Sequence, residues 1–286
     1  MISPKLSDFE FVFFGTDEFA GAVLAALVAA DLKPALIVTT PDQSCGRGQV
    51  LTPPPVKFWA ETQQIPYQQP KNLRSDLETS LRSDLGIKYQ LFLVASYGKI
   101  IPPEILALPE HGVLNLHPSL LPEFRGPTPI QSAILAGAAV TGVSLMLVDE
   151  EVDHGPILKV QSVKLKTQNF VELRDQLAKL GAQLFIETLP DWLAGKITPQ
   201  PQDHARATET KKLKKEDGLI NLTDDPQLNY RKFLALTPQP GIYCFVNQQR
   251  IIIAGAALTA GQFVITRVRP AGRREMTWAD FQRGLR

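Results

Sequence analysis

Residues 112–129 read GVLNLHPSLLPEFRGPTP. The stretch opens with an apolar run around Asn115, typical of a short buried strand, and the run ends at His117. Side chains two positions apart on a strand share a face, so Asn115 and His117 are expected to point the same way. An amide can donate to a developing oxyanion, and an imidazole can transfer a proton near neutral pH. Prolines and Gly126 then predict a stiff turn, a combination typical of the site of an α/β enzyme.

Asn-x-His is a weak signal by itself, because an Asn or His at a strand end is more often an ordinary loop residue than a catalyst. A second stretch, residues 142–158, reads GVSLMLVDEEVDHGPIL, an apolar strand pattern that breaks into a run of acids. A carboxylate from this loop could orient or charge His117, as a catalytic imidazole usually requires. The candidates are Asp149, Glu150, Glu151 and Asp153. The two stretches together predict a site but no particular reaction.

Composition limits the class of protein. The chain has 286 residues, enough for one large domain and a small one, and 44% of them are hydrophobic. A net charge of +1 gives no overall attraction to nucleic acid or membrane. Cys45 and Cys244 lie far apart, which fits a reducing compartment better than a disulfide framework. Neither a signal peptide nor an apolar run of about 20 residues is evident, so we expect a soluble cytoplasmic protein without a membrane partner.

The beginning of the chain predicts a parallel sheet. Residues 9–14, FEFVFF, indicate a buried strand, Asp17 can cap a helix over residues 19–30, and residues 36–39 form the next strand. A strand, helix and strand in this order predict a βαβ unit. The first turn carries a single glycine, Gly15, rather than G-x-G-x-x-G, so a dinucleotide is not indicated.

The same patterns continue along the chain and predict an α/β fold with a Rossmann-like, mostly parallel sheet. Further strands are expected at residues 65–67, 89–96, 143–148 and 157–165. Helices are expected from residue 56 onward and at residues 73–85, 104–108, 130–136 and 170–192.

Residues 39–61, TTPDQSCGRGQVLTPPPVKFWAE, form a longer connection than strand–helix loops usually have. Arg47 lies between two glycines in it. The loop is either a mobile surface loop with a solvated arginine or a clamp over an anionic partner, and the sequence leaves both open.

The composition changes after Trp192. We expect a catalytic domain at residues 1–194, a polar linker at 195–212, and a C-terminal domain at 213–286. Four lysines, at positions 211, 212, 214 and 215, are either a solvated face or a phosphate-binding run. A short helix from Tyr230 and short β-branched and aromatic runs from residue 241 onward predict a small antiparallel β domain.

From about residue 9 to the C-terminus, the chain resembles the methionyl-tRNA formyltransferases. The matching motifs are FFGTDEFA, PDQSCGRGQ followed by PPPVK, VASYGKIIP, NLHPSLLPEFRGPTPIQ, TGVSLMLVDEEVDHGPIL, ATETKKLKKEDGLINL and RPAGRREMTW. Asn115, His117 and Asp153 with residues 119–122 are specific for folate-dependent formyltransferases as a superfamily. The Gly-Arg-Gly loop and the lysine-rich segment resemble the tRNA enzymes in particular.

The resemblance implies formyl transfer from 10-formyltetrahydrofolate to the methionine amino group of initiator Met-tRNA. It implies Asn115, His117 and Asp153 as catalytic residues, and it implies no metal. The folate would contact Val94, Ala95, Ser96, Tyr97, Ser119, Leu120, Leu121, Pro122, Glu150 and Val152. The tRNA would contact Arg47, Lys211, Lys212, Lys214 and Lys215. We expect a monomer.

The chain departs from the family pattern in its C-terminal domain, which in the family resembles a five-stranded OB-fold barrel. The segment between Pro238 and residues 269–272 is shorter than in the family, so strands are expected to be missing and the barrel to be reduced or open. This departure bears on tRNA affinity more than on the chemistry.

Two alternatives stay open. One is a folate-dependent formyltransferase that acts on a small amine such as a nucleotide-linked amino sugar, which would keep the catalytic residues but would not need Arg47 or the lysine run. The other is a non-catalytic nucleic-acid-binding relative, against which the intact catalytic residues argue. A hydrolytic relative is disfavoured, because such members carry an additional N-terminal domain.

Overall fold

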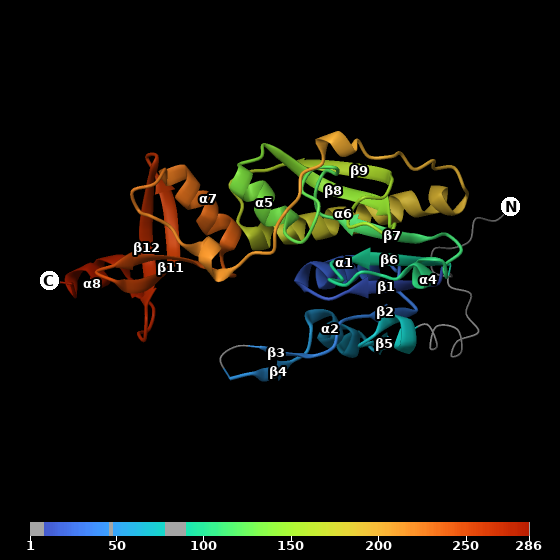
Figure 1. Cartoon of the computed structure of the whole chain (residues 1–286), viewed down its shortest axis with the longest axis horizontal. Coiled ribbons are helices and arrows are strands. Elements are labelled where there is room, and N and C mark those ends of the chain that lie inside the picture. Colours follow the sequence, from blue (N-terminus) through green and yellow to red (C-terminus); the bar gives the residue numbers. More distant parts are fainter. Residues whose placement is uncertain (1–8, 46–47, 78–89, 286) are drawn as a thin grey trace. The chain divides into compact units, whose positions relative to one another are not determined.

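The computed structural model describes residues 9–45, 48–77 and 90–285 (Figure 1). The chain forms two compact units, and each unit is built from several separate segments of the sequence. The first contains the described residues up to Gly126, together with Gly142–Val163 and Arg174–Glu209. The second contains Pro127–Thr141, Lys164–Leu173 and the residues from Thr210 onward.

The first unit is built on a sheet whose strand order is β5-β2-β1-β6-β7-β8-β9. Pairing is parallel from β5 through β7, and β7 pairs antiparallel with β8, so the predicted mostly parallel sheet is confirmed. The strands are β1 (Phe11–Gly15), β2 (Leu36–Val38), β5 (Tyr67–Gln68), β6 (Leu91–Ala95), β7 (Val113–His117), β8 (Val140–Leu147) and β9 (Ile157–Lys164).

The order of the strands reverses between β1 and β6. From β1 the chain adds β2 and β5 on one side, then returns to place β6 and β7 on the other. In open α/β sheets, ligands bind outside the carboxyl ends of the strands at such a reversal. Gly15 and Ala95 end the two strands side by side, which marks the expected position of a ligand crevice.

Helices complete this unit. Asp17 caps the first helix as predicted, because its side chain accepts from the Ala20 amide at 3.1 Å. The predicted helix at residues 73–85 begins at Leu73, and its residues 78–85 lie outside the described residues. The helical segments are α1 (Glu18–Ala29), α2 (Pro55–Gln63), η2 (Leu73–Leu77), α4 (Pro103–Leu106), α6 (Phe170–Leu193, from Arg174 in this unit) and η3 (His204–Arg206).

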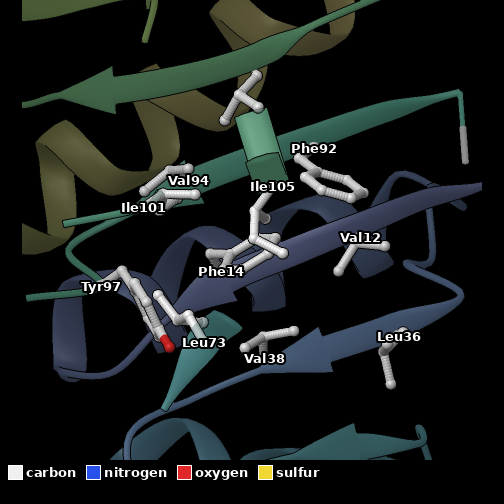
Figure 2. Close-up of a cluster of buried hydrophobic side chains, with 11 residues drawn as sticks. Val12, Phe14, Leu36, Val38, Leu73, Phe92, Val94, Tyr97, Ile101 and Ile105 are labelled. Atoms are coloured by element: carbon white, nitrogen blue, oxygen red, sulfur yellow. The ribbon is translucent and has the colours of Figure 1, made fainter. Parts of the chain in front are cut away.

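Both faces of the sheet are buried. On one face, the centroid of the Phe14 ring lies 5.2 Å from that of Phe92 and 5.4 Å from that of Tyr97. These residues belong to the buried cluster drawn in Figure 2. On the other face, Phe11 packs against Phe185 of α6 with ring centroids 6.0 Å apart. Burial on both sides explains why residues 9–14 read as an almost unbroken apolar run.

The segment expected to be a long loop contains an antiparallel hairpin of β3 (Gln43–Cys45) and β4 (Val50–Thr52). Val50 and Leu51 are both 65% exposed, so these strands lack the buried side that produces an alternating pattern. That is why the sequence predicted a loop here.

The second unit has a four-stranded antiparallel sheet in the order β10-β11-β12-β13. Among the described residues no pairing joins the edge strands β10 and β13, so the predicted reduced, open β domain is confirmed. Helix α7 begins at Pro226 rather than Tyr230, because Asp225 caps it by accepting from the Gln227 amide at 3.0 Å. The elements are α5 (Pro129–Ala136), η4 (Lys215–Gly218), α7 (Pro226–Leu236), β10 (Ile242–Val246), β11 (Gln249–Thr259), β12 (Gln262–Pro270), β13 (Met276–Thr277) and α8 (Trp278–Arg283).

Within the described part of the chain, no helix combines the length and the apolar composition needed to span a bilayer.

Candidate active site on strand β7

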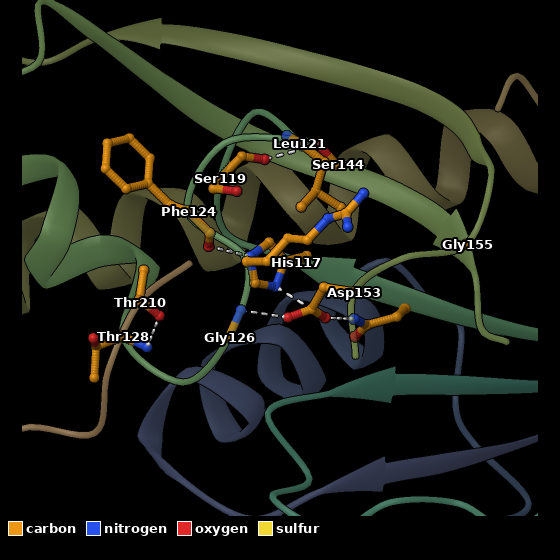
Figure 3. Close-up of polar contacts among 12 residues, drawn as sticks. His117, Ser119, Leu121, Phe124, Gly126, Thr128, Ser144, Asp153, Gly155 and Thr210 are labelled. Atoms are coloured by element: carbon orange, nitrogen blue, oxygen red, sulfur yellow. Dashed lines mark hydrogen bonds and ion pairs between the residues drawn. The ribbon is translucent and has the colours of Figure 1, made fainter. Parts of the chain in front are cut away.

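Asn115 and His117 lie on one face of β7, as the alternation predicts, and both side chains contact Asp153. Figure 3 shows His117 beside Asp153. The Asn115 amide donates to Asp153 Oδ1 at 3.2 Å, and His117 Nδ1 lies 3.4 Å from the same oxygen. The His117 side chain is 5% exposed and that of Asp153 is 12% exposed. The three predicted catalytic residues therefore meet in a largely buried cluster, where electrostatic interactions are stronger than in water.

Asp153 reaches this position through a loop that folds back along β7. Because β7 and β8 are antiparallel, Leu147 at the end of β8 pairs with Leu114 near the beginning of β7. The chain then returns toward His117, and Leu147 donates its backbone N–H to the Pro156 carbonyl at 2.9 Å. Asp153 has a φ of +52°, a left-handed conformation that a non-glycine residue adopts only with support from its surroundings.

Two neighbouring backbone groups complete the cluster. Asp153 Oδ2 accepts from the Gly126 amide at 2.7 Å, and His117 Nε2 lies 3.0 Å from the Phe124 carbonyl oxygen. A carbonyl can only accept, so this contact assigns a proton to Nε2 and turns Nδ1 toward the Asp153 carboxylate. Nδ1 is therefore the atom through which His117 can exchange a proton within the cluster.

The turn after β7 is held by buried hydroxyl groups. Ser144 on β8 donates to the Ser119 carbonyl at 2.8 Å and accepts from the Leu121 amide at 3.0 Å. Ser119 in turn donates to the Glu123 carbonyl at 2.6 Å. Both serines are fully buried, so the conformation of this turn is set by internal hydrogen bonds rather than by water.

The predicted folate residues come from the ends of β6 and β7 and from the loop after β8. Val94 on β6 pairs directly with Asn115, so residues 94–97 lie beside the catalytic strand. Within them the side chains of Val94, Ala95 and Tyr97 are buried, whereas Ser96 is exposed. Ser119 and Leu121 are buried, Leu120 and Pro122 are half-buried, and Glu150 and Val152 are exposed.

Asp17 contacts the end of β6. Its Oδ2 accepts from the Ser96 hydroxyl at 2.7 Å, and Thr16 Oγ1 donates to the Tyr97 carbonyl at 2.7 Å. Burial raises the pKa of the Asp17 carboxyl, and the hydrogen bond from Ser96 offsets part of that effect. These contacts connect the turn after β1 to the turn after β6, on either side of the strand-order reversal.

The four lysines expected to contact tRNA belong to a different compact unit from the catalytic cluster. The second unit contains all four lysines, and each of them is exposed: Lys211, Lys212, Lys214 and Lys215. The lysine run ends in η4, where Asp217 Oδ2 accepts from the Lys214 amide at 2.6 Å. Arg47 lies outside the described residues.

Gln202 and the backbone of Phe124 and Gly126 contact the cluster, but sequence reasoning did not identify them. Gln202 donates to the carbonyl oxygens of Asp153 at 2.9 Å and of Gly155 at 2.8 Å. It sits in a polar segment without a local motif, so no pattern distinguishes it from its neighbours. Phe124 and Gly126 lie within residues 112–129, but they contact the cluster through backbone atoms. The residue type says little about the contacts that backbone atoms make.

Within the described residues, no cluster of three or more His, Cys, Asp or Glu side chains has the geometry of a metal site.

Comparison with known proteins agrees with this geometry. The family model described as formyl transferase matches residues 9–189, and the model described as its C-terminal domain matches residues 212–263. A methionyl-tRNA formyltransferase of Chloroflexus aurantiacus is 44% identical over 87% of this chain and 80% of its own length.

Solved structures show the same fold. A methionyl-tRNA formyltransferase from Clostridium thermocellum superposes with a TM-score of 0.61 at 17% identity, over 92% of this chain and 98% of that one. HypX from Aquifex aeolicus in complex with tetrahydrofolic acid gives a TM-score of 0.67 at 16% identity, over 95% of this chain and 46% of that one. The family models, the sequence identity over most of the chain and the shared fold agree, and this chain therefore belongs to the methionyl-tRNA formyltransferase family.

Proposed function

We propose that this protein transfers the formyl group of 10-formyltetrahydrofolate to the amino group of methionine on initiator Met-tRNA, in translation initiation. The observation that carries the proposal is the convergence of Asn115, His117 and Asp153 in one buried cluster, in a chain of this family. The enzyme would act as a cytoplasmic monomer. Residues 1–194 would carry the chemistry, with residues 195–212 leading to a tRNA-binding domain at 213–286.

The chemistry requires a base and donors for an oxyanion. The methionine amine attacks the formyl carbon, and a tetrahedral intermediate with a negatively charged oxygen forms. The Asn115 amide and His117 Nδ1, when protonated, would donate to that oxygen, and each preorganised donor is worth roughly 3 to 4 kcal/mol. The Asp153 carboxylate would orient His117 and accept the proton that leaves the amine. The bond between the formyl carbon and N10 of the folate would then break as N10 takes up a proton, and tetrahydrofolate would leave.

The folate would lie beside the carboxyl ends of β6 and β7. The pterin would lie against the backbone of residues 94–97 and of the loop containing Glu150 and Val152, with residues 119–122 beside it. Buried side chains at Val94, Ala95 and Tyr97 leave backbone groups and Ser96 as the polar contacts available to it. The rigid turn held by Ser144 supports this role, because preorganised groups bind at lower entropic cost.

The tRNA would contact the four exposed lysines at positions 211, 212, 214 and 215 and, at its acceptor end, Arg47. Lysines pair with backbone phosphates as point charges and release counterions, so binding should weaken with salt. A small-amine acceptor would have no use for this run of exposed cations.

The deciding experiment is formyl transfer from 10-formyltetrahydrofolate to charged initiator Met-tRNA, run beside elongator Met-tRNA and a nucleotide-linked amino sugar over a salt series. We expect selective formylation of the initiator that weakens steeply with salt. Formylation of the amino sugar alone would assign the protein to the small-amine enzymes. Folate binding without transfer to any amine would contradict catalysis.

A further inference from the structure

The segment over residues 200–209, which we term the strap, runs along the two loops that hold His117 and Asp153. At its beginning, Gln200 and Ile157 exchange both backbone hydrogen bonds at 2.8 Å. At its end, the Arg125 amide donates to the Thr208 carbonyl at 2.8 Å. The polar composition of this segment is typical of a flexible connection, yet its backbone pairs with both loops.

Gln202 is the buried centre of the strap, with 6% of its surface exposed. Its Nε2 donates to the carbonyls of Asp153 and Gly155 at 2.9 and 2.8 Å. Its Oε1 accepts from Arg125 Nε at 3.2 Å and from a terminal nitrogen of the same guanidinium at 2.7 Å. Both donors and the acceptor of the amide are used, so the side chain is held in one orientation.

The hydrogen bonds of Gln202 hold the two loops next to the residues that form the catalytic cluster. The two carbonyls that Gln202 binds belong to Asp153 and Gly155, on either side of His154. Asp153 has a left-handed backbone conformation, which costs a non-glycine residue about 1 to 3 kcal/mol. Arg125, its other partner, lies between Phe124 and Gly126, whose backbone groups contact His117 and Asp153.

The second loop is also held by the strap at Thr208. The Thr208 hydroxyl accepts from the Phe124 amide at 2.8 Å, on the peptide unit preceding the carbonyl that contacts His117. The strap therefore holds the loop of His117 at one point and the loop of Asp153 at another, and Gln202 bonds to both loops through one amide.

We infer that Gln202 is a positioning residue for formyl transfer, which sets the distance between the His117 imidazole and the Asp153 carboxylate without touching the substrate. The inference rests on the proposed function for its kinetic consequence, but the geometric consequence can be measured independently. A misplacement of about 1 Å at a reacting group can cost about 100-fold in rate.

The test compares Gln202→Leu, Gln202→Glu and the matched control Gln200→Leu. The side chain of Gln200 is exposed and donates to the Thr198 carbonyl. Leucine removes all of the side-chain hydrogen bonds of Gln202. Glutamate keeps the acceptors for Arg125 but loses both donors to Asp153 and Gly155. We expect kcat to fall about 10- to 100-fold in both Gln202 variants, with KM for the folate changed less than about threefold.

A second readout uses the Gly126 amide, whose proton is bonded to Asp153 Oδ2 at 2.7 Å. The chemical shift of this amide in ¹H–¹⁵N spectra should change in both Gln202 variants and stay the same in Gln200→Leu. Thermal unfolding separates these effects from a loss of folded protein.

The inference is overturned if the Gly126 resonance stays in place in folded Gln202 variants, or if kcat stays within about twofold of the parent. It is also overturned if activity falls only in proportion to the folded fraction. A parent protein that formylates no amine would contradict the proposed function instead, and the Gly126 resonance would then decide the inference by itself.

Discussion

Asp153 is held by groups from separate parts of the chain. Its carboxylate accepts from the Asn115 side chain and the Gly126 backbone, and its own backbone carbonyl accepts from Gln202. A carboxylate that accepts from two donors is fixed in orientation. Each oxygen atom of Asp153 therefore accepts from a different donor group. Removal of any one donor should have a measurable effect on activity.

Replacement of Asn115 by Ala should lower kcat about 100- to 1,000-fold, because it removes a preorganised donor to the oxyanion. KM for the folate should change little, since the interaction is stronger in the transition state than in the ground state. Steady-state kinetics with saturating Met-tRNA measure the effect. The control is Gln183→Ala, an exposed amide on α6 that donates to Glu187. A loss smaller than about tenfold would contradict the role of Asn115.

Asp17 predicts a dependence of stability on pH. Because its pKa is raised in the folded state, the ionised carboxyl destabilises the fold at neutral pH. This cost disappears as pH falls through the folded-state pKa toward the unfolded value. Urea unfolding at pH 7, 6 and 5 should show the parent gaining stability relative to Asp17→Asn as pH falls. The exposed neighbour variant Glu18→Gln is the control, and a difference that is constant with pH would contradict the prediction.

Individual elements position the site through close packing of backbone. The loop after β8 turns back against the strand it has just left, and Leu147 bonds to Pro156 across this turn. A Cβ at Gly155 would overlap the Leu147 carbonyl oxygen, so the loop closes this tightly because residue 155 has no side chain. The position of Asp153 depends on that closure.

Gly155→Ala should therefore push the loop outward, destabilising the protein by about 1 to 3 kcal/mol and lowering kcat at least about tenfold. Denaturant unfolding and formyl-transfer kinetics measure the two effects. The matched control is Gly21→Ala in α1, where a Cβ meets no atom within 4 Å. Alanine in the helix should add about 0.5 to 1 kcal/mol of stability there. Wild-type activity in Gly155→Ala would contradict the packing argument.

At the scale of the whole molecule, the proposed chemistry and the proposed phosphate contacts of the lysine run belong to different compact units. The catalytic cluster belongs to the first unit, and the lysine run, the four-stranded sheet and α7 belong to the second. The four lysines of the run are exposed, so they should account for much of the affinity for tRNA.

Replacement of Lys211, Lys212, Lys214 and Lys215 by Ala should raise KM for initiator Met-tRNA much more than it lowers kcat. The slope of log KM against log salt concentration should decrease by about 1 for each phosphate that a lysine no longer neutralises. Kinetics at several salt concentrations measure both quantities. Lys179→Ala, an exposed lysine on α6 in the first unit, is the control. An unchanged slope would contradict the assignment of the run to phosphate binding.

The elements of this fold could be predicted where burial is uniform. Residues 11–14 and 91–95 produce unbroken apolar runs because both faces of the sheet are covered. Asp17 marks the beginning of a helix through its own side chain. The hairpin of β3 and β4 could not be predicted, because its exposed strands carry no hydrophobic alternation. Helix α7 begins before Tyr230, where the sequence predicts it, because Asp225 caps it and Pro226 occupies its first position.

The sequence by itself determined that Asn115 and His117 share a face, since the alternation of a strand depends only on neighbouring residues. It also determined which segments are strands or helices wherever the apolar pattern is regular. The resemblance to a family singled out Asp153 among several neighbouring acids.

Only the tertiary structure decided which groups meet. The antiparallel pairing of β7 and β8 and the backward fold of the following loop bring Asp153 to Asn115, 38 residues away. Gln202 reaches the Asp153 carbonyl from 49 residues away. Such contacts follow from the register of the sheet and the packing of loops, which are properties of the whole chain rather than of any local pattern.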